Sequence, residues 1–336
     1  MKNKKGELIL LLASVLWGTC FVFQKMGMDY IGPFTLGAFR FLLGAMVLIP
    51  VMILFDRMKK KKNPGEPEEL EKLEHLKKLE DLKKLEDLEK LEDLEKLKDL
   101  EKNKGFKDKE LYIGGGLCGT ALFAAASLQQ IGLQYTTAGK AGFITSLEIV
   151  LVAAVFILIS RKVQVNVLIG VSFAVVGMYL LCMVEGFYLE KGDTYELMGV
   201  IFWALQILAI DQYAKKVDVI KLSFVQFMTT GIVSCVFMFV FENPQVSSIV
   251  SGAIPILYTA IIEVAVAYTL QIIGQKYTQP DIASVILSLE SVFAVISGMV
   301  ILGEMISFRE FLGCVFMLAA IITTQLPKHS SHAKVK

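Results

Sequence analysis

The sequence has little charge outside one short segment. Lys, Arg, Asp and Glu number 67 in 336 residues, and 35 of them lie within residues 56–110. The other 281 residues carry only 32 charges, about 11%, against roughly 25% in soluble domains. A soluble fold would have to bury nearly all of this apolar part in one core, which the scaling of surface with size forbids.

Histidine and cysteine are also scarce, with three and five residues. No spacing of the two types is typical of a metal site. Each cysteine lies in an apolar segment and is predicted to be a small core residue rather than part of a disulfide: Cys20, Cys118, Cys182, Cys235 and Cys314. The sequence contains no P-loop, nucleophile elbow or zincin motif. We therefore expect neither an enzyme nor a cofactor, and no nucleic-acid partner.

One apparent motif has a simpler explanation. Residues 114–119, GGGLCG, satisfy the dinucleotide pattern G-x-G-x-x-G, but no strand is predicted before them. They open an apolar segment instead, so the favoured interpretation is close helix packing through small residues.

Ten apolar segments are long enough to cross a bilayer, because a spanning helix needs about 20 mostly apolar residues. They are residues 7–23, 32–55, 111–132, 138–159, 164–184, 197–214, 222–241, 252–273, 281–302 and 308–326. The sequence therefore predicts an all-α polytopic membrane protein with ten transmembrane helices, integral to the cell (inner or plasma) membrane.

Lysine and arginine in the short loops predict the orientation. With the N-terminus inside, the inner segments hold most of the basic loop residues: Lys2, Lys4, Lys5, Arg57, Lys59 to Lys62, Arg161, Lys162, Lys215, Lys216, Lys221, Lys276, Lys328, Lys334 and Lys336. The outer segments are acidic, apart from Lys191 and Arg309: Glu185, Glu190, Asp193, Glu196, Glu242, Glu304 and Glu310. Both termini are predicted to be cytoplasmic.

The chain contains an internal repeat. Residues 128–150, LQQIGLQYTTAGKAGFITSLEIV, align without gaps on residues 270–292, LQIIGQKYTQPDIASVILSLESV, at an offset of 142. Further upstream, Trp17 and its neighbours align on Trp203 and its neighbours at an offset of 186. The offsets differ by 44, so an insertion of about that length is predicted in the first half.

Each half is expected to hold five spans. The first repeat is predicted at residues 1–58 and 105–190, the insertion at 59–104, the second repeat at 191–327 and a cytoplasmic tail at 328–336. Because five is odd, the second copy enters the membrane in the opposite orientation. Such inverted repeats are typical of transporters, whose site lies near the membrane midplane between the repeats.

Several residues in these segments also resemble a known family. The first two segments carry Trp17-Gly18, Phe21, Lys25, Pro33 and Arg40-Phe41, and the later ones Ser288-Leu289-Glu290 and Leu302-Gly303-Glu304. Across all ten spans the chain resembles the EamA family of the drug/metabolite transporter (DMT) superfamily. The resemblance implies a permease that moves amino acids, other metabolites or toxic compounds, often outward. The sequence departs from the family pattern in having Ser291 and Ile149 where proline is frequent, and Ser160-Arg161 where the first repeat has Gly-Glu.

Three glutamates, Glu148, Glu263 and Glu290, lie near the centres of predicted spans. A charge there costs about 2.5–3.5 kcal/mol on insertion scales, so such residues face a partner or a water-filled cavity. Glu148 and Glu290 are repeat mates, whereas the mate of Glu263 is Ala121. We predict that all three contribute to substrate binding or coupling. The structural alternative is that hydrogen bonds to them only fix helix packing.

Cationic and acidic residues nearer the span ends have two interpretations each. Arg40, nine residues into the second span, either forms an ion pair with a glutamate or binds a substrate carboxylate through its planar guanidinium. Lys25 and Lys140 either extend to the outer interface or attract anions there. Asp211 either pairs with neighbouring lysines or lines the transport path.

Polar and aromatic residues inside the spans complete the predicted site. Trp17 and Trp203 occupy equivalent positions, several residues inside their spans, and are predicted to form a cavity wall. Gln129, Gln271 and Tyr268 are further candidates for substrate contact. Interhelical hydrogen bonds explain them equally well, as they do Gln130, Ser146 and Ser288.

The sequence thus predicts a secondary transporter for a small polar or zwitterionic metabolite such as an amino acid, working by alternating access and most simply as an exporter. Burial disfavours the charged form of a carboxylate, so the buried glutamates can bind protons and the transporter can exchange protons for substrate. Within the transporter class, a multidrug or cationic-compound exporter is the alternative. Outside it, the alternative is a membrane scaffold that acts through the insertion.

The insertion has its own pattern. Leucine stands at every third position from residue 70 to residue 100, separated by Glu, Lys and Asp. These are helix-forming residues, but a spacing of three turns the leucine row by about 60° per step and cannot form the fixed seam of a coiled coil. The tract is either a low-complexity, natural or engineered helical insertion, or an arm that binds a protein partner, a second copy or the membrane.

Overall fold

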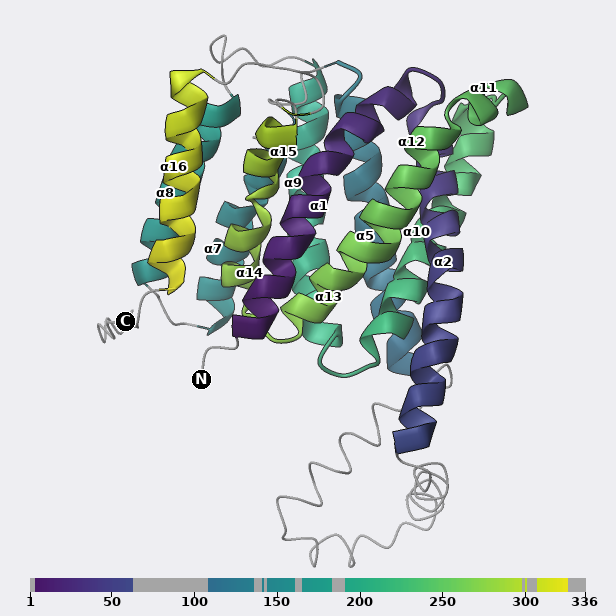
Figure 1. Ribbon diagram of the computed structural model, residues 1–336, viewed down its shortest axis with the longest axis horizontal. Coiled ribbons are helices and arrows are strands. Elements are labelled where there is room, and N and C mark those ends of the chain that lie inside the picture. Colours follow the sequence, from purple (N-terminus) through teal and green to yellow (C-terminus); the bar gives the residue numbers. More distant parts are fainter. Residues whose placement is uncertain are drawn as a thin grey trace, which may run out of the picture.

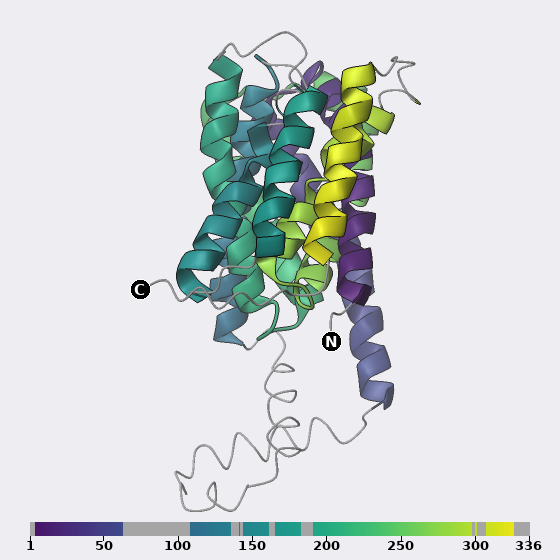
Figure 2. The same cartoon turned by 90° about the vertical axis from the view of Figure 1, so that its left-hand side faces the viewer.

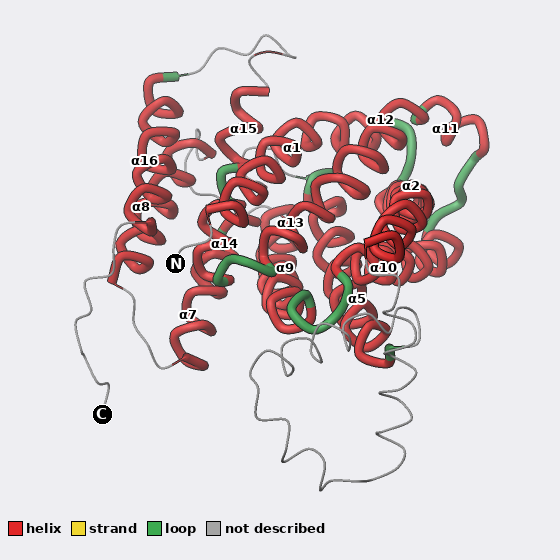
Figure 3. The backbone as a smooth tube through the Cα atoms, turned by 60° about the horizontal axis from the view of Figure 1, so that its bottom comes forward, coloured by secondary structure: helices red, strands yellow, loops and turns green. Residues whose placement is uncertain are grey.

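A computed structural model describes residues 4–62, 108–135, 141, 144–160, 165–182, 191–297, 300 and 307–325. Within these ranges all regular structure is helical (Figure 3). The helices stand side by side in one bundle, and the C-terminal end of α2 projects beyond it (Figures 1 and 2). Residues 59–62 of the predicted insertion continue α2, and residues 63–104 lie outside the described residues.

The helices follow one another along two halves of the chain. The first half contains α1 (Lys4–Met28), α2 (Pro33–Lys62), α5 (Lys109–Gly132), α7 (Glu148–Ser160) and α8 (Val165–Cys182). The second half contains α9 (Lys191–Tyr213), α10 (Val219–Phe241), α11 (Val246–Ser251), α12 (Ala253–Tyr258), the π-helical segment η3 (Thr259–Tyr268), α13 (Thr269–Gln275), α14 (Pro280–Leu287), α15 (Glu290–Ser297) and α16 (Phe308–Gln325).

Seven helical stretches in the described residues are long and apolar enough to cross a membrane. They are Lys4–Met28, Pro33–Met58, Lys109–Gly132, Lys191–Tyr213, Val219–Phe241, Ala253–Gln275 and Pro280–Ser297. Three shorter apolar helices, Ile144–Leu158, Val165–Gly177 and Phe311–Thr323, lie where the fourth, fifth and tenth spans are predicted. An all-helical membrane protein is thus confirmed, and the count of ten spans stays a prediction.

The distribution of side chains is that of a protein surrounded by lipid. Large apolar residues are exposed on the outside of the bundle, as with Leu158, Phe239 and Val246. Polar side chains, among them Arg40 and Gln226, are buried inside it. A surface of this kind would aggregate in water but suits hydrocarbon.

Helix ends are fixed by polar residues at the bundle surfaces. The Asp218 carboxylate accepts hydrogen bonds from the backbone N–H groups of Ile220 and Lys221 at the start of α10. At the other end of α10, the Glu242 carboxylate accepts from the N–H groups of Phe34 and Thr35. A carboxylate near a helix N-terminus is favourable, so Glu242 ties the end of α10 to the start of α2.

The glycine cluster of α5 packs closely against α10 and α9. A Cβ atom on Gly115 would lie 2.4 Å from Val225 Cγ1, and one on Gly119 would lie 2.6 Å from the Gln226 carbonyl oxygen. A Cβ on Gly114 would meet Tyr213 at 2.6 Å, whereas nothing lies within 4 Å of one on Gly116. The interpretation of the G-x-G-x-x-G sequence as a helix-packing surface is confirmed.

The sixth predicted span begins earlier than expected. Sequence hydropathy placed its start at residue 197, whereas α9 begins at Lys191. Asp193 lies in the first turn of α9, where an acidic side chain complements the helix dipole. Glu196, predicted to lie in an outer loop, is therefore part of the helix and is only 1% exposed.

Candidate functional site

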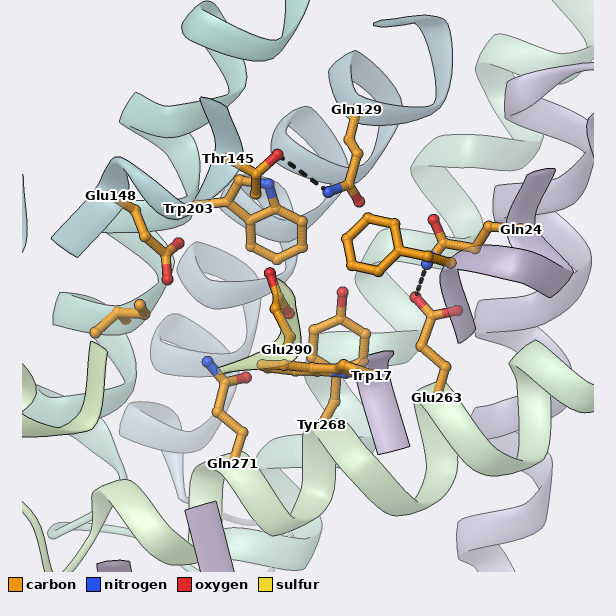
Figure 4. Close-up of a pocket in the computed structure, with 12 residues that line it drawn as sticks. Trp17, Gln24, Gln129, Thr145, Glu148, Trp203, Glu263, Tyr268, Gln271 and Glu290 are labelled. Carbon is orange, nitrogen blue, oxygen red and sulfur yellow. Dashed lines mark hydrogen bonds between the residues drawn. The ribbon is translucent and has the colours of Figure 1, made fainter. Parts of the chain in front are cut away.

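A polar cavity lies inside the bundle, between helices of both halves of the chain (Figure 4). Its volume is about 30 Å³, which is room for roughly two water molecules. The lining residues come from α1, α5, the segment leading into α7, the start of α7, and α9, η3, α13 and α15: Trp17, Phe21, Gln24, Gln129, Thr145, Glu148, Trp203, Ile207, Glu263, Tyr268, Gln271 and Glu290.

Two of the lining glutamates begin helices partway along apolar segments. α7 starts at Glu148 after a turn at Leu147, and α15 starts at Glu290 after α14 has ended at Leu287. Each carboxylate thus lies in the first turn of a helix, where partial positive charge favours an anion. Among the described residues, no hydrogen bond or ion pair is formed by the carboxylate of Glu148 or Glu290.

Serine side chains explain the break before Glu290 without proline. The Ser288 hydroxyl donates to the Val285 carbonyl oxygen at 2.9 Å, and the Ser291 hydroxyl donates to the Ser288 carbonyl oxygen at 2.8 Å. Such bonds compete with the backbone and bend or interrupt helices. Ser291, which stands where the family often has proline, therefore belongs to the break itself.

Glu263 differs from the other two glutamates because it has a cationic partner. Its Oε1 lies 3.1 Å from Nη1 of Arg40, and it also accepts a hydrogen bond from Gln24 Nε2 at 2.9 Å. Gln24 in turn accepts from Gln130 Nε2. Arg40 is 1% exposed and is not among the side chains that line the cavity. The Arg40 guanidinium therefore forms an ion pair with Glu263, which is the first of the two interpretations that the sequence allowed.

Three aromatic side chains line the cavity beside the glutamates. Trp17 meets Tyr268 edge to face with ring centroids 4.9 Å apart, and Trp203 stacks on Tyr268 at 6.3 Å with an interplanar angle of 7°. In Figure 4 the Tyr268 ring lies between Glu290 and Glu263, and the Trp203 ring lies beside Glu290. The indole Nε1 atoms of Trp17 and Trp203 are buried and have no hydrogen-bond partner among the described residues. Both can donate to a ligand.

The glutamine candidates take part in interhelical hydrogen bonds. Gln271 on α13 and Gln206 on α9 exchange two amide hydrogen bonds, at 3.2 and 3.4 Å. Gln129 Nε2 donates to Thr145 Oγ1 at 3.3 Å. Gln129 and Gln271 therefore line the cavity and join helices at the same time.

The structure brings together eight of the twelve candidate residues that the sequence suggested. Trp17, Trp203, Gln129, Gln271, Tyr268, Glu148, Glu263 and Glu290 line the cavity, and Arg40 lies behind Glu263. Lys25 is exposed near the end of α1. Asp211 forms an ion pair with Lys215 away from the cavity. Lys140 lies outside the described residues.

Four lining residues were missed by sequence reasoning. Phe21 and Ile207 are apolar, but the offset of 186 that aligns the tryptophans aligns these two as well, so the repeat could have revealed them. Gln24 and Thr145 align with Ile210 and Leu287, so the repeat contained no signal for them. In the parts of the chain that the structure describes, no group of three His, Cys, Asp or Glu side chains is placed to hold a metal ion.

The apolar exterior and polar interior define an integral membrane protein, and comparison with known proteins gives its family. The model of the EamA-like transporter family matches residues 4–68 and 190–325. The chain therefore belongs to the EamA-like transporter family and is a membrane transporter rather than an enzyme.

Two further similarities agree with this family. An uncharacterized transporter of Archaeoglobus fulgidus is 28% identical over 327 residues, which cover 97% of this chain and 87% of the relative. A solved crystal structure has the same fold, with a TM-score of 0.69 at 16% identity over 96% of both chains.

Proposed function

We propose that the protein is a secondary transporter that moves a small metabolite bearing an amino group, an amino acid or a similar solute, by alternating access. The observation that carries this proposal is the pair of carboxylates, Glu148 and Glu290, which line a cavity inside the bundle without a cationic partner among the described residues. An uncompensated carboxylate inside a membrane is costly unless a cation or a proton joins it.

The charge balance of the cavity favours an amine over a simple anion. Arg40 neutralises Glu263, so among the described residues the two remaining carboxylates set the charge of the cavity lining. The faces of Trp17, Trp203 and Tyr268 add sites where an ammonium group is attracted. The free indole N–H groups of the two tryptophans suit a carboxylate on the same solute. A zwitterion satisfies both requirements.

Cargo entry requires a change of conformation. In this conformation the cavity, at about 30 Å³, is too small even for an amino acid. Helices must therefore separate to admit the cargo, and the helix starts at Glu148 and Glu290 are the places where such movement would change the site directly. A multidrug exporter would need a far larger opening.

An inverted repeat provides the two conformations that alternating access needs. Supporting it, α1 and α9 run in opposite directions in Figure 1, as do α2 and α10. The cavity also contains both members of four pairs that the sequence repeat aligns: Trp17 with Trp203, Phe21 with Ile207, Gln129 with Gln271, and Glu148 with Glu290.

The same arrangement supports a cytoplasmic position for both termini. α1 begins and α16 ends at one end of the bundle, where the basic connection between α9 and α10 also lies (Figure 1). Lys215, Lys216 and Lys221 lie in or beside this connection. The rule that basic loops face inward assigns this end to the cytoplasm.

Counterflow in liposomes tests the function. Purified protein is reconstituted with one unlabelled solute inside, and uptake of the same labelled solute is followed for each amino acid and for a set of cationic dyes. Uptake of amino acids but not dyes is the expected result. Uptake of dyes alone would replace the metabolite proposal by the multidrug alternative, and no uptake of any solute would reject both.

A further inference from the structure

A chain of hydrogen bonds leaves the cavity at Thr145. Its hydroxyl donates to Oε2 of Glu196 at 2.9 Å and accepts a hydrogen bond from Gln129 Nε2 at 3.3 Å. Thr145 and Gln129 both line the cavity, whereas Glu196 does not. One hydroxyl group therefore connects the cavity to a carboxyl group behind its wall.

The position of Glu196 disfavours a carboxylate anion. It is 1% exposed, and its second oxygen, Oε1, is buried without a hydrogen-bond partner among the described residues. A Cβ atom on Gly132, the last residue of α5, would lie 2.6 Å from that oxygen. The C-terminal end of a helix carries partial negative charge. An anion placed here is therefore both poorly solvated and repelled.

The charges around Glu196 do not compensate it. Asp193, three residues earlier on α9, adds a second negative charge. The cation at this end of α9, Lys191, lies over the Tyr135 ring, 4.8 Å from its centroid. α5 contributes Gln129 and Gly132 at this end, and the segment before α7 contributes the neutral Thr145. Among the described residues no cation forms an ion pair with Glu196.

We propose that Glu196 is a proton-carrying group of the transporter, connected to the cargo cavity through the hydroxyl group of Thr145. The inference rests on the proposed function, and it assigns the proton a route separate from the cargo carboxylates. Glu196 is the sixth residue of α9, roughly 8 Å from its start. That end of the bundle is opposite the one assigned to the cytoplasm, so the route leads outward.

The transfer conserves protons and charge. The Thr145 hydroxyl, which donates to Glu196 Oε2 in the structure, first rotates to donate to a water molecule in the cavity. The Glu196 carboxyl then gives its proton to Thr145 Oγ1 while the Thr145 hydroxyl proton passes to that water molecule, which becomes hydronium. Glu196 is left as a carboxylate, and it takes its next proton from the outer side. The cavity has room for the water that this step requires.

Infrared titration of the reconstituted protein tests the proton itself and needs no cargo. The wild-type spectrum is expected to contain a protonated-carboxyl band near neutral pH that is absent in Glu196→Gln and shifted in Thr145→Val. Thr145→Ser restores its position, and Ser146→Ala, which removes the neighbouring buried hydroxyl, leaves the band in place. A band that is unchanged in Glu196→Gln would overturn the inference.

Proton flux gives the second readout. Liposomes loaded with a pH-sensitive dye receive a mixture of the standard amino acids as the probe. We expect Glu196→Gln to lower cargo-dependent proton movement by about a hundredfold, the lower range for one positioned proton-transfer group, while cargo counterflow persists. Wild-type counterflow without proton movement would overturn this inference and leave the proposed function standing. Absence of wild-type counterflow would reject the proposed function, and the infrared result would still decide whether Glu196 holds a proton.

Discussion

Arg40 and Glu263 form a buried ion pair of which only the carboxylate reaches the cavity. The Arg40 Nη1 atom lies 3.1 Å from Glu263 Oε1, and the two side chains are 1% and 2% exposed. Gln24 donates a further hydrogen bond to the same carboxylate oxygen. The pair joins α2 to η3, so it fixes helices of the two halves of the chain against each other.

Breaking this ion pair from one side is expected to destabilise the protein strongly. Arg40→Met leaves the Glu263 charge buried without its partner, which costs about 3–5 kcal/mol. The double variant Arg40→Met with Glu263→Gln removes both charges and should recover most of that loss. Thermal unfolding in detergent, analysed as a double-mutant cycle, measures the coupling. Additive effects of the two changes would show that the residues do not depend on each other.

Comparison of the double variant with Glu263→Gln alone separates the two roles that the sequence left open for Arg40. If Arg40 only forms the ion pair with Glu263, the double variant shows the same amino-acid counterflow as Glu263→Gln. If Arg40 binds a substrate carboxylate, the counterflow of the double variant falls below that of Glu263→Gln. Because Arg40 does not line the cavity, we expect equal counterflow in the two variants.

Neutralising either unpaired carboxylate should impair transport without unfolding the protein. A hydrogen bond to a charged group contributes about 1.5–3 kcal/mol, so Glu148→Gln and Glu290→Gln should each weaken cargo binding by roughly 10- to 100-fold. Asp211→Asn is the matched control, because Asp211 pairs with Lys215 outside the cavity. Counterflow at several cargo concentrations measures the effect. Unchanged flux in Glu290→Gln would remove that residue from the site.

Close contact between α1 and α15 makes Gly18 intolerant of a side chain. A Cβ atom there would lie 2.4 Å from Phe293 Cβ and 2.7 Å from the backbone nitrogen of Ala294. Since backbone cannot move aside cheaply, Gly18→Ala should cost about 1–3 kcal/mol. Gly116→Ala, with nothing within 4 Å, is the control and should leave the melting temperature unchanged. Equal melting temperatures for the two variants would contradict the packing described for α1.

The charged tract is expected to be dispensable for transport. The cavity-lining residues that the structure describes lie on other segments. Deleting residues 66–102 should therefore leave counterflow unchanged. Size-exclusion chromatography and capture of bound proteins from native membranes test the alternative, an interaction arm. Loss of flux or of a defined complex on deletion would favour the arm.

Sequence reasoning found the parts of the site that the two halves share, and missed those that belong to one half alone. Glu148 and Glu290 stand out because each is a charge in an apolar segment with an aligned counterpart. Thr145 and Glu196 align with Leu287 and Leu10, so comparison of the halves contains no signal for them. Hydropathy also placed Glu196 in a loop rather than in α9. Three acidic residues at 190, 193 and 196 lower the mean hydropathy around Lys191, where α9 begins.

The helix break before Glu290 is a second feature that the sequence did not predict, and it can be tested directly. Proline is the usual sequence signal for a helix break. Here the hydroxyl groups of Ser288 and Ser291 donate hydrogen bonds to backbone carbonyl oxygens instead. The Ser291 N–H makes only a 3.3 Å hydrogen bond to the Ser288 carbonyl oxygen. Ser291 also lies in the first turn of α15, where the missing N–H of proline is tolerated.

Ser291→Pro should therefore fold and transport nearly as the wild type does. Ser284→Pro is the matched control, because Ser284 lies in the interior of α14, where proline costs about 3 kcal/mol or more. The melting temperature and the counterflow activity of both variants show whether proline is tolerated at residue 291 but not at residue 284. If Ser291→Pro were as damaging as Ser284→Pro, the N–H of residue 291 would be needed by a continuous helix. Glu290 would then lie within an uninterrupted span rather than at the start of one.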